Sequence, residues 1–475
     1  MKPLVPVILF DTLTRTEREL IPLDGKAFRF YCCGPTVYGP AHIGNFRTFI
    51  LQDTFRRVME LSGVDTLHVR NLTDVDDKTI RDSQKAGLSL LDFTDGWTRK
   101  FHADCQALHL LPPHIEPGAV NHIPEQVHMI EQLMAKGHAY QGADGSVYFK
   151  IDSYHDYGRL SHLDKRELQT GAGQAGLSDE YEKEAASDFV LWKARKDSDG
   201  PNHWPSPWGD GRPGWHLECS AMIERYLGTE FDLHSGGEDL VFPHHENEIA
   251  QSCCANGGAF AHHWFHLTHL MVDSTKMSKS LGNLYTLDEL EAKGFTPAQV
   301  RYVLTSAHYR QQLNFTLENV EGAKQPLLRL AKIEARLREK AGATNTPTYD
   351  ELRGLKDLGV FTEAWRALLH DLNTPAALGH VFTALRELKP ESLSQAEATT
   401  EWKALHFILA AFGIELPSLE EEKLEIPAEI TALAERRWQA KQAKDWAGAD
   451  TLRKELDALG WIIKDSKQSY EVLKK

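Results

Sequence analysis

The chain has 475 residues, of which 41% are hydrophobic and 25% are charged. That length exceeds what one hydrophobic core serves, so we expect more than one domain. A formal net charge of −15 argues against a general nucleic-acid binder. No apolar run approaches the roughly 20 residues that span a bilayer, and six cysteines are too few for a disulfide framework in so long a chain. We expect a cytoplasmic monomer with no membrane partner.

The first part of the chain alternates apolar strands with helices. A buried strand is predicted at 28–33, and the helix after it begins past His42 and ends near Ser62. A second strand is predicted at 66–70 and a second helix at 76–86. Strand, helix, strand and helix at this spacing predict a parallel sheet with crossover helices.

A long interruption follows. A helical stretch is predicted over 91–137 and a hairpin at 147–151, and the segment 170–210 shows little periodicity. Because the region lacks the strand–helix alternation on either side of it, we interpret about 115–215 as an insertion in the parallel-sheet domain.

The sheet pattern resumes with a strand at 231–234 and a further strand at 264–272. After Asn283 the apolar residues recur every 3.6 positions, which predicts a helical bundle. The predicted bundle helices are 296–306, 320–341, 360–372 and 375–388. The last unit, about 428–475, is predicted to form two helices and then two short strands.

The predicted fold class is therefore α/β, followed by smaller parts. A Rossmann-like parallel-sheet catalytic domain covers 1–295, an all-helical bundle covers 296–420, and a small α+β domain covers 428–475. From Thr431 to Lys475 there are ten basic and seven acidic residues, a net charge of +3, which leaves −18 for the remainder. A basic tail on an acidic body can dock RNA locally.

Two short segments favour chemistry at a phosphate group. His42, Gly44 and Asn45 lie where a strand gives way to a helix, and exposed N–H groups at such a helix start attract anions. The loop Lys276–Ser280 places Lys276 and Lys279 as a cationic clamp suited to a leaving pyrophosphate. The alternative is that His42 only caps the helix and that the loop is ordinary solvated surface.

A second set of residues has the side chains of a zinc site. Cys33 ends the first strand, Cys219 lies downstream of the interruption, and His244 and Glu248 are spaced to share one helical face. The alternative is that the two cysteines are buried thiols and that the His–Glu cluster is polar surface.

Taken together, these segments resemble the cysteinyl-tRNA synthetase family of class I aminoacyl-tRNA synthetases. The likeness extends over nearly the whole chain, and its motifs are specific to the class and to the amino acid. The segments that carry it are Tyr31–Tyr38, Ala41–Asn45, Asn71–Lys78, Pro213–Met222, Phe242–Glu248, Lys276–Asn283 and Lys441–Ile463.

The resemblance implies ATP-dependent ligation of L-cysteine to tRNA(Cys) through a cysteinyl-adenylate. It implies one Zn²⁺ per chain on Cys33, Cys219, His244 and Glu248, which would bind the substrate sulfur and make an editing domain unnecessary. ATP is implied as a substrate with Mg²⁺. The resemblance implies contacts to ATP from the lysine loop, Lys279 foremost, with transition-state charge stabilised by His42 and Lys279. Thr73 and Trp215 are implied to line the amino-acid pocket, the helical bundle to contact the tRNA stem, and 428–475 to bind the anticodon.

Two positions depart from the family pattern. Asn45 stands where the class motif ends in histidine, and an amide can donate a hydrogen bond but carries no charge. We expect activity to persist with His42 more important. Ser274 and Thr275 stand where a glycine is common before the lysine loop, which predicts a less mobile loop.

Two other functions remain open from the sequence. One is a ligase that passes cysteine from the same adenylate to a small amine, and the region after about 300 argues against it. The other is a non-catalytic synthetase paralogue, against which the intact Lys279 and the four candidate zinc ligands argue.

Overall fold

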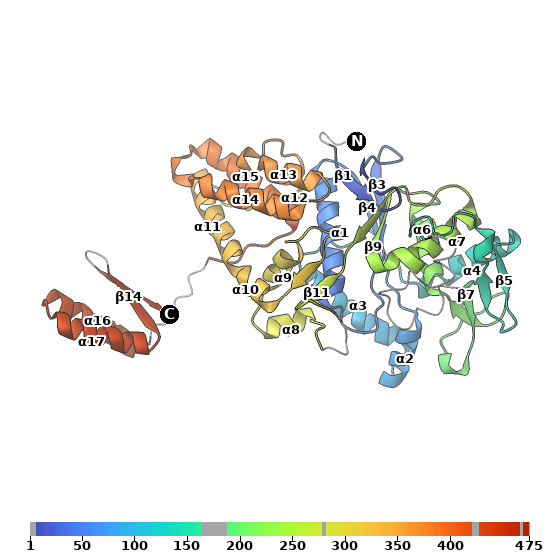
Figure 1. Cartoon of the computed structure of the whole chain (residues 1–475), viewed down its shortest axis with the longest axis horizontal. Coiled ribbons are helices and arrows are strands. Elements are labelled where there is room, and N and C mark those ends of the chain that lie inside the picture. Colours follow the sequence, from blue (N-terminus) through green and yellow to red (C-terminus); the bar gives the residue numbers. More distant parts are fainter. Residues whose placement is uncertain (1–5, 164–187, 278–281, 420–426, 466–468, 475) are drawn as a thin grey trace. The chain divides into compact units, whose positions relative to one another are not determined.

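The computed structural model describes residues 6–163, 188–277, 282–419, 427–465 and 469–474 (Figure 1). The chain divides into two compact units, Met1–Pro417 and Ser418–Lys475. Among the described residues, no helix combines the length and the apolar character needed to cross a bilayer.

A four-stranded parallel sheet lies at the centre of the first unit. Its strands are β3 (Ala27–Cys32), β4 (Asp65–Arg70), β9 (Leu233–Gly237) and β10 (Trp264–Leu267), in the order β10-β9-β3-β4. Helix α1 (Ile43–Leu61) follows β3 and leads to β4. The predicted α/β class with a parallel sheet is confirmed.

Side chains along β3 alternate between two cores, because successive residues of a strand point to opposite faces. Phe28, Phe30 and Cys32 pack in one core with the apolar residues of α1. Tyr31 and Cys33 pack in another core on the opposite face, with residues of α6 (Trp215–Leu227). The two adjacent cysteines therefore have different surroundings.

The interruption contains an antiparallel sheet of β5 (Ala139–Gln141), β6 (Val147–Phe149), β7 (Phe189–Ala194) and β8 (Gly211–Pro213). Strand β7 lies inside 170–210, where the sequence predicts little regular structure. Its side chains at Phe189, Leu191 and Trp192 are fully buried, so packing rather than local periodicity specifies it.

The helical stretch predicted over 91–137 is two helices, α3 (Leu90–Ala107) and α4 (Ile123–Ala135). The chain between them contains Pro112, Pro113 and Pro117, which cannot supply the N–H groups that a continuous helix needs.

The strand predicted at 264–272 is two strands in different sheets. After β10 the chain enters β11 (Leu270–Val272), which pairs with β12 (Thr275–Lys276) and, in parallel, with β13 (Leu313–Phe315). At the break, the buried Arg47 of α1 donates to the carbonyl oxygens of Thr268 and His269 at 3.0 and 2.8 Å. A distant side chain thus satisfies the backbone where the ladder stops. Strand β13 also lies in the region expected to be all-helical.

Apart from the antiparallel pair β1 (Ile8–Asp11) and β2 (Thr16–Glu19) near the N-terminus, the rest of the first unit is mainly helical (Figure 1). Its helices are α8 (Leu287–Ala292), α9 (Pro297–Leu304), α10 (Leu317–Gly322), α11 (Lys324–Ala341), α12 (Tyr349–Arg353), α13 (Thr362–Leu369), α14 (Thr374–Glu387) and α15 (Gln395–Phe412). The second unit has two helices, α16 (Ala428–Gln442) and α17 (Trp446–Ala458), and then the antiparallel pair β14 (Trp461–Asp465) and β15 (Tyr470–Lys474). This is the order predicted from the sequence.

A buried ionic cluster on α1 joins the sheet domain to the helices that follow it. The Asp53 carboxylate accepts from Arg57 at 2.7 Å, from Arg301 of α9, and from the backbone N–H of Leu111 at 2.9 Å. Burial alone raises the pKa of Asp53, but the two guanidinium groups outweigh it and hold the pKa at about 2.

We predict that Asp53→Asn lowers the free energy of unfolding by about 3–5 kcal/mol, because two buried guanidinium groups lose their anion. Because the pKa of Asp53 is lower in the folded protein than in the unfolded chain, its ionised carboxylate stabilises the fold above about pH 4. This stabilisation is lost as the pH falls from about 4 to about 2. Chemical denaturation of both proteins over that pH range measures the effect. A wild-type protein that loses no more stability than the variant on acidification would contradict this prediction.

Candidate functional site

The site begins where β3 ends at the carboxyl edge of the sheet, the edge at which ligands of open parallel sheets bind. The backbone N–H of Cys33 donates to Ser235 of β9 at 3.1 Å. At the next residue, a Cβ atom added to Gly34 would lie 1.7 Å from the carbonyl oxygen of Asn71. Only glycine allows this close approach of the two strand ends.

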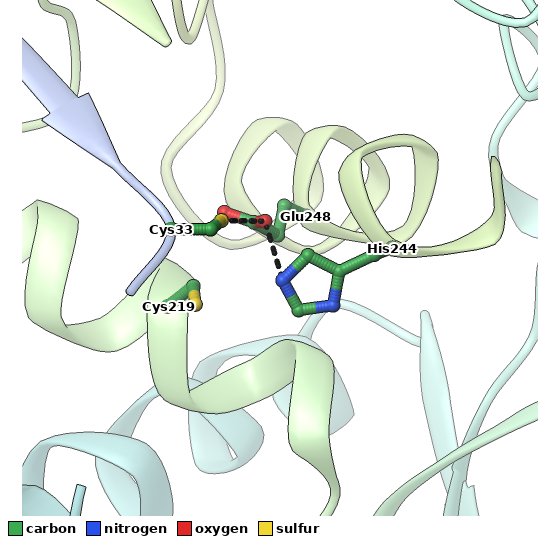
Figure 2. Close-up of side chains that lie close together, drawn as sticks. All are labelled: Cys33, Cys219, His244 and Glu248. Atoms are coloured by element: carbon green, nitrogen blue, oxygen red, sulfur yellow. Dashed lines mark hydrogen bonds and ion pairs between the residues drawn. The ribbon is translucent and has the colours of Figure 1, made fainter. Parts of the chain in front are cut away.

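Three further segments bring polar side chains to Cys33 (Figure 2). Cys219 comes from α6, His244 from the turn Val241–His245, and Glu248 from the first turn of α7 (Glu246–Asn256). One donor atom from each of these side chains lies within 4.8 Å of every other, and all four residues are buried. The structure therefore brings together the four residues named by the resemblance.

The geometry of the cluster fits a bound metal ion. His244 Nε2 lies 3.0 Å from Glu248 Oε1, yet this buried nitrogen makes no hydrogen bond of acceptable geometry. The sulfur of Cys33 lies 3.9 Å from the same carboxylate oxygen. A buried imidazole nitrogen without a hydrogen bond, next to two sulfurs and a carboxylate, forms a donor set of the kind that divalent metals take.

Proton affinities in the cluster are strongly perturbed. A hydrogen bond from the Cys33 thiol is the main cause that lowers the pKa of Cys219 to about 6, whereas burial raises the pKa of Cys33 well above its ordinary value. Burial alone lowers the pKa of His244, but Glu248 and Cys219 raise it to about 10. Positive charge is thus stabilised at the centre of these groups, as a metal ion requires.

Three more histidines contact three of these four residues, His244, Glu248 and Cys33. His216 Nδ1 lies 2.7 Å from His244 Nδ1, His234 Nε2 lies 2.9 Å from Glu248 Oε2, and His245 Nε2 lies 3.4 Å from the Cys33 sulfur. When Nδ1 of His244 donates to His216, its Nε2 keeps a lone pair directed at the cluster.

Sequence reasoning did not single out these three histidines as functional residues. His216 and His245 lie inside the quoted motifs, so their adjacency to candidate ligands was the available signal. His234 reaches the cluster only because its strand, β9, pairs with β3.

A second group of four overlaps the first. Cys33 and Glu248 also lie within 4.8 Å of His234 and His245. His245 Nδ1, however, is 2.7 Å from His266 Nε2, so its ring is already engaged on the far side. Both groups contain Cys33 and Glu248. The first adds Cys219 and His244, and the second adds His234 and His245.

Of the two residues expected to line an amino-acid pocket, Trp215 packs against this cluster and Thr73 lies beyond the end of β4. The Trp215 ring lies 4.1 Å from the His244 ring, centroid to centroid, at an interplanar angle of 36°. Thr73 is fully buried just beyond β4, where its backbone N–H donates to Pro35 at 3.1 Å and its hydroxyl accepts from Asn71 at 3.1 Å. Both therefore border the strand ends that carry Cys33.

His42 is the N-cap of α1 and forms a capping box with Asn45. The backbone N–H of Asn45 donates to His42 Nδ1 at 3.2 Å, and the Asn45 side-chain oxygen accepts from the backbone N–H of His42 at 3.2 Å. The alternative in which His42 caps the helix is therefore confirmed, and capping uses only Nδ1 of its ring. Because Nδ1 accepts a hydrogen bond, the proton of the neutral ring resides on Nε2, which can still donate to a ligand.

The lysine loop borders this helix start. A Cβ atom added to Gly44 would lie 3.3 Å from the Met277 sulfur, and the backbone N–H of Ile43 donates to Tyr285 at 2.9 Å. The backbone of Lys276 belongs to β12, whereas its side chain and all of Lys279 lie outside the described residues. Ser274, the position where the family often has glycine, has a left-handed φ of 62°.

Comparison with known proteins agrees with this geometry. A family model described as tRNA synthetases class I (C) catalytic domain matches residues 19–325, and one described as Cysteinyl-tRNA ligase anticodon binding domain matches 424–472. A cysteine–tRNA ligase of Opitutus terrae is 55% identical over 98% of both chains. One of Brachyspira hyodysenteriae is 42% identical over 97% of this chain and 98% of that protein. This chain belongs to the cysteine–tRNA ligase family.

Solved structures of class I synthetases share the fold at low identity. A methionyl-tRNA synthetase of Mycobacterium tuberculosis bound by methionyl-adenylate aligns with a TM-score of 0.56 at 14% identity, over 82% of this chain and 90% of that one. A LeuRS of Agrobacterium radiobacter in a ternary complex with tRNA aligns with a TM-score of 0.57 at 12% identity, over 82% and 84%. Membership of the cysteine–tRNA ligase family therefore agrees with the class I fold.

We predict that purified protein holds about one divalent ion per chain and that Cys219→Ala and His244→Ala each abolish its retention. Elemental analysis after gel filtration measures the ion. Cys32→Ala is the matched control, because the neighbouring thiol faces the other core. If both ligand variants kept the ion and His234→Ala lost it, the ion would be assigned instead to the second group, Cys33, His234, His245 and Glu248.

Proposed function

We propose that this enzyme ligates L-cysteine to tRNA(Cys) in two steps, through a cysteinyl-adenylate. The observation that carries the proposal is the buried cluster of two thiols, an imidazole and a carboxylate at the carboxyl edge of the sheet. The capped start of α1 borders the same edge. A metal-type donor set next to an anion-binding helix start suits a substrate that has a thiol and reacts with a nucleotide.

We infer that Cys33, Cys219, His244 and Glu248 hold one Zn²⁺. Two sulfurs, one imidazole nitrogen and one carboxylate are donors that suit zinc. Bound zinc would supply a Lewis acid that takes the substrate sulfur as thiolate. Trp215, stacked beside His244, and Thr73 would border the rest of the amino acid.

ATP is proposed to lie with its phosphates at the start of α1, accompanied by Mg²⁺. A carboxylate oxygen of cysteine attacks the α-phosphorus, and the bond from that phosphorus to pyrophosphate breaks. His42 Nε2–H donates to a phosphate oxygen, and Lys276 and Lys279 stabilise the departing charge. Gly44 leaves room for the nucleotide, because it has no side chain. A hydroxyl of the tRNA 3′-terminal ribose then attacks the adenylate carbonyl and AMP leaves.

The proposed organisation assigns adenylate chemistry to residues 1–295, with the insertion at about 115–215. A tRNA stem-contact role goes to 296–420 and anticodon binding to 428–475. The match of 424–472 to an anticodon-binding model supports tRNA as the acceptor. It argues against the small-amine alternative, because such an acceptor has no anticodon to recognise.

We predict that Cys219→Ser greatly weakens the preference for cysteine over serine. An apolar pocket alone separates such small differences by roughly 10- to 200-fold, so the preference should fall to that level. ATP–pyrophosphate exchange driven by each amino acid, compared as kcat/KM, measures it. Cys32→Ser is the control and should keep the wild-type preference. Full discrimination in Cys219→Ser would remove the metal from the account of specificity.

A further prediction concerns Asn45. Asn45→Ala removes the side-chain half of the capping box, which costs about 1 kcal/mol at helix starts, and should lower kcat/KM for ATP by about 10-fold. Asn45→Thr should stay within a few-fold of wild type, because Thr79 fills the same role at the start of α2 (Asp77–Ala86). Equal losses in both variants would show that the amide contacts the nucleotide directly.

A further inference from the structure

The side chain of Tyr31 lies in the same core as two of the candidate metal ligands. Tyr31 is on β3, two residues before Cys33, so both side chains project from one face of the sheet. Tyr31, Cys33 and Cys219 pack in one core, and Tyr31 is fully buried. Its ring meets the ring of His234 edge-on, at 5.3 Å between centroids. Packing against the neighbouring strand therefore fixes the position of the phenol group.

The hydroxyl of Tyr31 is a buried polar group whose hydrogen bonding is not satisfied by the protein. Its oxygen makes no hydrogen bond within the part of the chain that the structure describes. Such a group costs free energy unless an acceptor takes its hydrogen bond. Burial raises the pKa of Tyr31 well above its ordinary value, and the neighbouring Cys219 and Cys33 raise it further. The phenol therefore keeps its proton and can donate a hydrogen bond to an adjacent sulfur.

Three of the four candidate metal ligands already have a histidine as an outer partner. These pairs are His216 with His244, His234 with Glu248, and His245 with Cys33. Outer partners of this kind orient a ligand and tune the metal ion that it binds. Cys219 is the ligand that the three pairs leave out. The unsatisfied hydroxyl of Tyr31 thus adjoins the one candidate ligand that has no histidine partner among these pairs.

The charge of the occupied site explains why Cys219 needs a hydrogen-bond donor. Two thiolates and one carboxylate outweigh the charge of a divalent ion, and a substrate thiolate adds a further negative charge. Negative charge in a buried volume is costly unless donors surround it. An O–H group beside Cys219 would stabilise part of that charge, as the histidine N–H groups do for Cys33 and Glu248.

We propose that the Tyr31 hydroxyl donates a hydrogen bond to the metal-bound Cys219 sulfur and acts as a positioning residue of the thiol-binding centre. The inference rests on the proposed function, because it takes a metal-bound thiolate as the acceptor. Cys219 loses its proton when it binds a metal ion, and charged acceptors form the stronger hydrogen bonds. Tyr31 therefore favours the thiolate form of Cys219, holds the sulfur in place and weakens its repulsion of the substrate sulfur.

The test uses the full-length protein loaded with Co²⁺, a spectroscopic substitute for Zn²⁺. Tyr31→Phe removes only the hydroxyl oxygen. Loss of the hydrogen bond raises the energy of the sulfur lone pair, so the sulfur-to-cobalt charge-transfer band should move to longer wavelength. The affinity for Zn²⁺, measured by competition with a chelator, should fall by about 10- to 100-fold.

Tyr349→Phe is the matched control. The buried hydroxyl oxygen of Tyr349 also makes no hydrogen bond within the described residues, but its ring packs against a different core. The cobalt band and the affinity for Zn²⁺ should both keep their wild-type values in this variant. An equal change in the control would overturn the inference.

Two more measurements separate a hydrogen bond to the sulfur from a packing role. Replacement of Tyr31 by 3-fluorotyrosine, which also serves if Tyr31→Phe folds poorly, makes the phenol a stronger donor and should move the band to shorter wavelength. In the metal-free protein Tyr31→Phe should not lower the free energy of unfolding, because the lost hydroxyl is unsatisfied there. A band that shifts in neither variant, or equal destabilisation of the metal-free and Zn²⁺-loaded proteins, would overturn the inference.

Kinetics distinguish this inference from the proposed function. In ATP–pyrophosphate exchange, Tyr31→Phe should raise the KM for cysteine by about 10-fold and leave the KM for ATP nearly unchanged. Absence of exchange in the wild-type protein would refute the proposed function. The cobalt band and the affinity for Zn²⁺ are measured without cysteine or ATP, so they would still decide whether Tyr31 donates to Cys219.

Discussion

Glu248 carries the buried charge around which the Cys–His–Glu cluster is arranged. Its carboxylate is fully buried, and a carboxylate removed from water costs several kcal/mol unless it is paired. His244 and His234 approach its two oxygens at 3.0 and 2.9 Å, and the Cys33 sulfur stands at 3.9 Å. Burial alone raises the pKa of Glu248, but His234 and His244 outweigh it and hold the pKa below its ordinary value. The buried Glu248 carboxylate therefore requires a cation or a metal ion beside it, and the surrounding histidines supply and orient such partners.

The parallel sheet explains why the buried Cys–His–Glu cluster and the start of α1 lie at the same edge of the sheet. The carboxyl ends of β3, β4 and β9 meet at one edge, so Cys33, Thr73 and the His234 strand converge there without any long excursion of the chain. The start of α1 follows β3 directly and faces the same edge. A ligand that has both a sulfur and a phosphate could reach both centres across this edge, which is the arrangement that adenylate formation from a thiol amino acid needs.

The sequence predicted the elements whose apolar period is strong and local. Strands β3 and β4 and helices α1 and α2 were predicted within one residue of their bounds, whereas the strands predicted at 231–234 and 264–272 differ from β9 and β10 by up to five residues. The resemblance named Cys33, Cys219, His244 and Glu248, which the structure brings together. It did not predict β7, whose strand depends on burial of Trp192 against other elements, nor the break after β10, where Arg47 satisfies the backbone. His234 was also beyond reach, because its contact with the cluster depends on strand order, whereas His216 and His245 lie within segments that carry the resemblance. Contacts between segments far apart in the chain produce no periodic spacing of apolar residues from which they could be predicted.

The capping box at α1 explains how a departure from the class motif can be harmless. The two nitrogens of His42 have separate tasks in the proposed mechanism: Nδ1 accepts the Asn45 backbone N–H and caps the helix, and Nε2 donates to a phosphate oxygen. What the fourth motif position must provide is an acceptor for the His42 backbone N–H, and an asparagine oxygen does so at 3.2 Å. A full positive charge is not required for that contact. The constraint on this position is therefore geometric, and the proposed mechanism assigns stabilisation of the transition-state charge to His42 and the lysine loop rather than to residue 45.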